Sequence, residues 1–170
     1  SSTTKNYHGM PLAFLSYLDS DSNLDFIQTR LKLENLIYLG IRDIDPYEKE
    51  ILDKYQIGNY SVSDCENYLP NVLSDLQSWI GDNPIHISFD VDSLDPSVVD
   101  STGTPVPGGL TANTGKQIID LLHKHNWVNL DITELNVSLG NPDKSMENLK
   151  FIMNNILEQP NEFELIKSQL

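Results

Sequence analysis

The sequence has 170 residues, of which 39% are hydrophobic and 21% are charged, and its formal net charge at pH 7 is -14. This length fits one domain with a respectable core, and the composition is that of a globular protein. The acidity argues against binding to nucleic acid or to anionic membranes, and it favours cationic ligands or metal ions. It is concentrated between Lys54 and Lys116, where eight acids and no Lys or Arg occur.

Cys65 is the only cysteine, so no intrachain disulfide is possible, which suits a reducing compartment. No apolar run approaches membrane-spanning length, and no signal-like segment opens the chain. The chain begins with Ser1 in place of Met, which indicates a processed or excised piece. We therefore expect a cytoplasmic protein, with mitochondrial residence left open.

The first half of the chain predicts two strands and two helices. A short helix is expected over 12–18, and the apolar run over 36–41 is typical of a strand covered on both faces. Asp45 as N-cap and Pro46 at the first helical position predict a helix through about residue 55. The apolar patch over 57–62 predicts a second strand.

The second half continues the alternation of strands and helices. The expected elements are a helix over 63–80 broken near Pro70, a strand over 85–91, a loop over 93–110, a helix from Thr111 or Thr114 to about 125, a strand over 127–133, and a helix capped by Ser145 that runs to 157. Such an order is typical of an α/β fold with right-handed crossovers and a parallel sheet. Residues 1–158 are expected to form the domain portion, and 159–170 a polar tail.

Three of these strands end in unusual polar groups. Asp90 and Asp92 are two residues apart, so on an extended strand both carboxylates point to one face. Two carboxylates in an apolar setting need a cation or shared protons. Arg42 to Asp45 and Glu134 follow two other strands, and the carboxyl ends of parallel strands share one edge. This pattern predicts half of a divalent-metal site.

Each group also has a simpler interpretation. Asp90 and Asp92 could belong to a strand that runs into an Asp-capped turn, Asp45 is a credible helix cap, and Glu134 could be an exposed loop acid. A single histidine in a polar loop, such as His8, is usually a surface residue. The combination of three acidic strand ends is what favours a site.

Several segments together resemble a known family. Ser88 to Pro96, with 102–105 and 108–110, is similar to the signature of the ureohydrolases, which include arginases and agmatinases. Four further segments narrow the resemblance to arginase, and their order and spacing hold from the first residues to about Leu157. These segments are 6–11 (Asn-Tyr-His-Gly-Met-Pro), 40–46 (Gly-Ile-Arg-Asp-Ile-Asp-Pro), 130–136 (Leu-Asp-Ile-Thr-Glu-Leu-Asn) and 138–140 (Ser-Leu-Gly).

The resemblance implies the C-terminal part of an arginase-like fold: a partial doubly wound, mainly parallel sheet with helices on both faces, whose N-terminal half is missing. It also implies a centre of two Mn²⁺ ions that hydrolyses the guanidinium of L-arginine to L-ornithine and urea. Carboxylate oxygens suit Mn²⁺, and such ions activate water. Family members are often trimers, so a homo-oligomer is expected.

The resemblance also implies residue roles. Asp90 would bridge both metal ions and Asp92 would complete one of them. Glu134 would pair with the guanidinium, and His8 would carry protons to the leaving amine. The remaining residues would bind or orient the substrate; they are Thr4, Asn6, Asp45, Glu48 and Thr104.

The family's other metal ligands come from a Gly-Gly-Asp-His segment and an Asp-Ala-His-x-Asp segment, and neither is present. Four of six expected ligands are therefore absent, and we expect the isolated chain to be inactive or barely active. Two alternatives stay open. One is a non-catalytic arginase-like binding module that keeps the substrate-end groups. The other is an agmatinase-like specificity.

Overall fold

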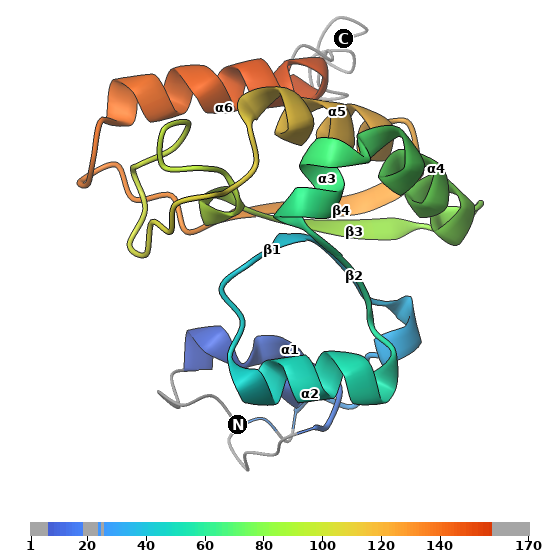
Figure 1. Cartoon of the computed structure of the whole chain (residues 1–170). Helices are drawn as coiled ribbons and strands as arrows, with labels where there is room; N and C mark the ends of the chain where they lie inside the picture. The colour runs from blue at the N-terminus through green and yellow to red at the C-terminus, as the bar shows by residue number, and fades with distance from the viewer. Residues whose placement is uncertain (1–6, 19–23, 25, 158–170) are drawn as a thin grey trace, which may run out of the picture. The chain divides into compact units, whose positions relative to one another are not determined.

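The computed structural model describes residues 7–18, 24 and 26–157 (Figure 1). The chain divides into two compact units, residues 1–61 and residues 62–170. Each unit carries a two-stranded parallel sheet of its own. Within the described ranges, no helix combines the length and the apolar character needed to cross a bilayer.

The first unit is a strand–helix–strand element preceded by short helical turns. The strands β1 and β2 pair in parallel, with Ile37 opposite Gly58, and α2 connects them. Pro46 lies in the first turn of α2, and Asp45 and Glu48 form a capping box, in which the Asp45 N–H donates to Glu48 Oε2 at 2.9 Å. The elements are η1 (Tyr7–Gly9), α1 (Pro11–Leu15), η3 (Leu33–Asn35), β1 (Ile37–Ile41), α2 (Pro46–Tyr55) and β2 (Gly58–Ser61).

The second unit contains α3 to α6 and the β3–β4 sheet. Figure 1 shows these helices on one side of the sheet. The two strands are parallel because α5 carries the chain back between them. The elements are α3 (Val62–Asn67), α4 (Leu69–Ile80), β3 (Ile85–Asp90), η4 (Val91–Ser93), α5 (Ala112–His123), β4 (Trp127–Thr133) and α6 (Pro142–Leu157).

Burial alternates along β3, and this alternation identifies its core face. Ile87 and Phe89 are buried, whereas His86 and Ser88 are exposed. The helices contribute fully buried aliphatic side chains, such as Leu76 of α4 and Ile152 of α6. The core therefore lies between the helices and one face of β3, directly behind the end of the strand that carries Asp90.

The strand β4 is less covered than β3. Among the described residues it pairs with β3 alone, and the side chains of Val128 and Ile132 are 68% and 45% exposed. Apolar side chains with this exposure on an edge strand are unusual for a self-contained sheet. This agrees with the expectation of a partial sheet.

The predicted α/β class with parallel strands is confirmed, and so is the break near Pro70 in the helix over 63–80. This helix breaks at Tyr68, and Pro70 lies in the first turn of α4, where its missing N–H costs nothing. Other details of the prediction are wrong. The strand β3 ends at Asp90 instead of Val91. Ser145 does not cap α6: the helix begins at Pro142, Lys144 N donates to Asn141 Oδ1 at 3.2 Å, and Ser145 is fully buried.

Replacement of Ile152 by Ala tests this core. The side chain is 0% exposed, so its truncation leaves a cavity and should lower the free energy of unfolding by about 2 to 5 kcal/mol. Met146→Ala on the same helix is the control, because Met146 is 37% exposed. Urea unfolding followed by circular dichroism measures both, and an equal small loss would contradict the packing described.

Candidate functional site

Asp90 and Asp92 lie where β3 leaves the sheet. Asp90 is the last residue of β3, and Asp92 lies in the 3-10 turn η4. The Asp92 N–H faces Asp90 Oδ1 at 3.4 Å, so the two residues are neighbours as predicted. The reason differs from the prediction, because Val91 turns into the core at 0% exposure and the extended strand does not continue. A turn, not strand alternation, brings the carboxyl groups together.

The surroundings of Asp90 disfavour its negative charge. Burial, followed by the negative charge of Asp92 and more weakly that of Glu134, raises the pKa of the Asp90 carboxyl to about 6. A hydrogen bond from the Asp92 backbone acts in the opposite direction, and its effect is smaller than those of burial and of the Asp92 charge. A cation bound close to these acids would therefore stabilise the ionised form of Asp90.

Thr104 also reaches this point. It belongs to the loop over 93–110, and its Oγ1 donates a hydrogen bond to Asp92 Oδ2 at 3.1 Å. The two ends of the loop run side by side, because Leu110 N donates to Ser93 O and Asp95 N donates to Leu110 O, both at 2.9 Å. The predicted placement of Thr104 beside the acidic pair is therefore observed.

Asp95 joins the two ends of this loop, and it is not among the site residues predicted from the sequence. Its carboxylate accepts hydrogen bonds from the backbone N–H groups of Gly108 (2.8 Å), Gly109 (3.2 Å) and Ser97 (2.9 Å). A hydrogen bond with the Ser97 side chain, together with these backbone bonds, lowers the pKa of Asp95 to about 2. A Cβ at Gly109 would lie 2.4 Å from Asp95 N. The signal that could have found this closure is an Asp-Pro step, typical of an Asx turn, matched to a later Gly-Gly pair.

Glu134 follows β4 directly and has a left-handed backbone, with φ of 63°. Left-handed conformations are uncommon in residues other than glycine, so the surroundings must hold the backbone there. The neighbouring Leu135 bridges to Thr102, and Asn136 N donates to Ser101 O at 2.8 Å. The Glu134 side chain is exposed, and its charge acts on Asp90.

The second unit thus brings together four of the predicted site residues: Asp90, Asp92, Thr104 and Glu134. Asp45 and Glu48 lie in the first unit, where they bond to each other in the capping box of α2. His8 lies in η1, with its side chain outside the described residues. Thr4 and Asn6 lie outside the described residues altogether.

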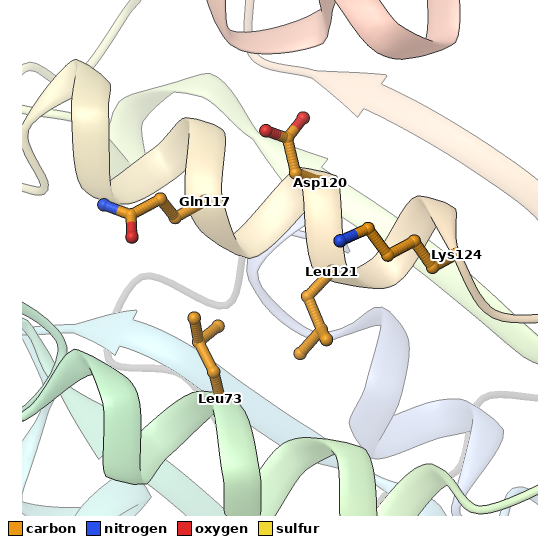
Figure 2. A pocket seen from close by; sticks show the side chains of 5 residues that line it. All are labelled: Leu73, Gln117, Asp120, Leu121 and Lys124. Carbon is orange, nitrogen blue, oxygen red and sulfur yellow. The ribbon is translucent and has the colours of Figure 1, made fainter.

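A hollow of about 250 Å³ lies between α4 and α5 and contains none of the predicted site residues (Figure 2). One of its polar side chains, Asp120, already accepts hydrogen bonds from Lys116 Nζ at 2.9 Å and from Asn155 Nδ2 at 2.7 Å. The lining residues are Leu73, Gln117, Asp120, Leu121 and Lys124.

The acidic end of β3 fits a divalent cation in chemistry but not in ligand number. Asp90 and Asp92 offer the oxygen ligands that hard divalent ions prefer, and the crowding at Asp90 would be relieved by positive charge. However, the described residues hold no group of three or more His, Cys, Asp or Glu side chains arranged to bind a metal. Two carboxylates alone do not satisfy the coordination of such an ion.

The chain matches the model of the arginase family over residues 1–157, so it belongs to this family. It is 40% identical over 146 residues to the arginase of Emericella nidulans, covering 81% of this chain and 45% of that protein. It is 35% identical over 150 residues to human Arginase-1, covering 82% and 47%. The arginase of Entamoeba histolytica in complex with L-ornithine superposes with a TM-score of 0.85 at 26% identity, covering 92% of this chain and 54% of that one.

The chain spans about half the length of the curated relatives it matches. The resemblance to arginase expected from the sequence segments is confirmed, and so is the partial arginase-like α/β fold.

Replacement of Asp90 by Asn tests the crowding of the three acids. The pKa of Asp90 is raised from 3.8 to about 6, so the folded chain binds a proton more tightly than the unfolded chain, and its stability falls as the pH rises between these values. In the metal-free chain, Asp90→Asn should therefore raise the free energy of unfolding at pH 7 by about 1 to 2 kcal/mol once solvent screening is allowed for.

This gain should disappear below pH 3.8, where Asp90 is protonated in both states. Urea unfolding from pH 3 to pH 8 measures it, with Asp82→Asn in the exposed turn after α4 as the control. Loss of stability at pH 7 in Asp90→Asn would contradict the electrostatic assignment.

Replacement of Asp95 by Ala tests the closure of the loop. Without the carboxylate, the N–H groups of Gly108 and Gly109 lose their acceptor, so their amide hydrogen exchange should accelerate. Asp95→Asn keeps one acceptor oxygen and should give an intermediate rate. Because the pKa of Asp95 is about 2, the wild-type protection should persist to pH 3 and fade as the pH falls through 2. Unchanged exchange in Asp95→Ala would show that the backbone hydrogen bonds alone hold the two ends of the loop together.

Proposed function

We propose that this chain supplies part of the active site of a manganese-dependent arginase, which hydrolyses L-arginine to L-ornithine and urea. The observation that carries the proposal is the gathering of Asp90, Asp92, Thr104 and Glu134 at the ends of two parallel strands in a member of the arginase family. The relative from Entamoeba histolytica, crystallised with L-ornithine, supports the choice of substrate.

In this proposal Asp90 and Asp92 hold the metal ions together with ligands that the chain does not contain. When bound, the ions supply Lewis acidity and an activated water. The crowding of Asp90 by Asp92 and Glu134 supports this role, because positive charge would remove a repulsion that the folded chain otherwise carries. Thr104 donates a hydrogen bond to one oxygen of Asp92, which helps to fix the orientation of this carboxylate.

Glu134 would bind the guanidinium of the substrate. Its carboxylate is exposed at the strand end and matches the planar donor fork of a guanidinium. His8 would pass a proton to the leaving amine, which suits a side chain that titrates near neutral pH. The α-amino and α-carboxylate ends of the substrate would be held by Thr4, Asn6, Asp45 and Glu48.

Glu134→Gln tests the proposal in the native protein that carries this sequence, loaded with Mn²⁺. Glutamine keeps the size of the side chain but loses the charge. The transition state for urea release from arginine should therefore lose about 2 to 4 kcal/mol of stabilisation, which is measured as a lower kcat/KM. Glu147→Gln, an exposed acid on α6, is the matched control and should leave kcat/KM unchanged.

Three other outcomes would change the proposal. No urea from the wild-type protein would favour a non-catalytic binding module. Urea from agmatine in place of arginine would favour an agmatinase-like enzyme. An unchanged kcat/KM in Glu134→Gln would refute the guanidinium role of this residue.

A further inference from the structure

The segment over 134–141 connects β4 to α6 and begins with Glu134. Its first part is bonded to the loop over 93–110. Leu135 bridges to Thr102, and Asn136 N donates to Ser101 O at 2.8 Å. Ser101 and Thr102 are 0% and 2% exposed, so the part of the loop that receives the segment is fixed in the core.

The far end of the same segment is bonded to Asp100, the residue just before Ser101. Asp100 Oδ1 accepts a hydrogen bond from Asn141 N at 2.8 Å and one from Ser145 Oγ at 3.2 Å. The backbones also touch there, because a Cβ on Gly140 would lie 2.5 Å from the Asp100 carbonyl oxygen. The hydrogen bond from Asn141, aided by Ser145, lowers the pKa of Asp100, so its carboxylate stays ionised at neutral pH.

These contacts hold both ends of the segment that begins with Glu134. Its side chain is exposed and its backbone is left-handed, so the position of its carboxylate depends on how the following residues are held. Four residues beyond Asp100, Thr104 bonds to Asp92. Residues 100–104 therefore contact the acidic pair at one end and hold the Glu134 segment at the other.

We propose that Asp100 is a positioning residue of this site: by binding Asn141 and Ser145 it fixes the segment over 134–141, and thereby the place of the Glu134 carboxylate relative to Asp92. The catalytic part of this inference rests on the proposed function, in which Glu134 binds the guanidinium. Asp100 itself touches neither substrate nor metal, and it acts through Glu134.

A double-mutant cycle between Asp100→Ala and Glu134→Gln tests this dependence. In the native Mn²⁺-loaded protein, Asp100→Ala should lower kcat/KM for arginine by about tenfold or more, because a misplaced binding group costs transition-state stabilisation. In the Glu134→Gln background the same change should cost less than about twofold, because the group that Asp100 positions is already lost. Equal losses in the two backgrounds would overturn the inference.

Two further variants separate positioning from general damage. Asp143→Ala removes a carboxylate from the first turn of the same helix without touching the loop, and it should leave kcat/KM unchanged. Asp100→Asn keeps an acceptor oxygen for Asn141 and Ser145, and it should restore most of the activity. If Asp100→Ala fails to fold, Ser145→Ala, which removes one donor, replaces it in the cycle.

A measurement that needs no activity complements the cycle. In the 170-residue chain, Asp100→Ala should accelerate amide exchange at Asn136, which lies five residues before the lost bond, whereas Asp143→Ala should not. If Glu134→Gln alone leaves kcat/KM unchanged, the proposed function of Glu134 fails, and the Asn136 exchange still decides whether Asp100 holds the segment. Unchanged exchange at Asn136 in Asp100→Ala would refute the inference.

Discussion

The burial of the Asp90 carboxyl beside other negative charges at the end of β3 is the constraint on which the candidate site of the second unit depends. Asp90 is partly buried, and the charges of Asp92 and Glu134 oppose its ionisation. A fold selected for stability alone would place an uncharged side chain there. The helices on one face of the sheet, with Val91 and Leu94 fully buried, keep the chain in this unfavourable place. The ionised Asp90 therefore lowers the stability of the fold at the point where the proposed chemistry needs negative charge.

The loop over 93–110 turns this local crowding into an organised site. Asp95 joins the two ends of the loop by accepting hydrogen bonds from Gly108 and Gly109, and Thr104 bonds to Asp92. Asp100 bonds to the segment that follows Glu134. All three contacts are made by polar side chains to groups fixed by the fold, which is how rigid elements hold functional groups in a defined geometry. These hydrogen bonds hold the long loop in a defined conformation.

The limits of sequence-based prediction follow from the range of the interactions involved. The apolar runs of β1, β3 and β4 and the capping chemistry of Asp45-Pro46 are local, and they predicted the elements well. Ser145 was taken for a helix cap because its local pattern fits one, but Asn141 caps the helix and Ser145 bonds to Asp100, 45 residues away. The roles of Asp95 and Asp100 depend on contacts across 14 and 41 residues, which composition and periodicity do not reveal. The resemblance to the arginase family was predicted from the order of several motifs along the chain. The spacing of Asp90 and Asp92 alone is also compatible with a strand that runs into an Asp-capped turn.

We propose that this chain carries part of a metal-dependent site and that further ligands are needed to complete it. Calorimetric titration of Mn²⁺ into the 170-residue chain, with a urea assay on the same sample, tests this most directly. Weak or absent binding and no urea are the predicted result, because two carboxylates do not fix a pair of ions. Tight, stoichiometric binding with urea production would contradict this proposal and show that the chain completes the site by itself or with a second copy.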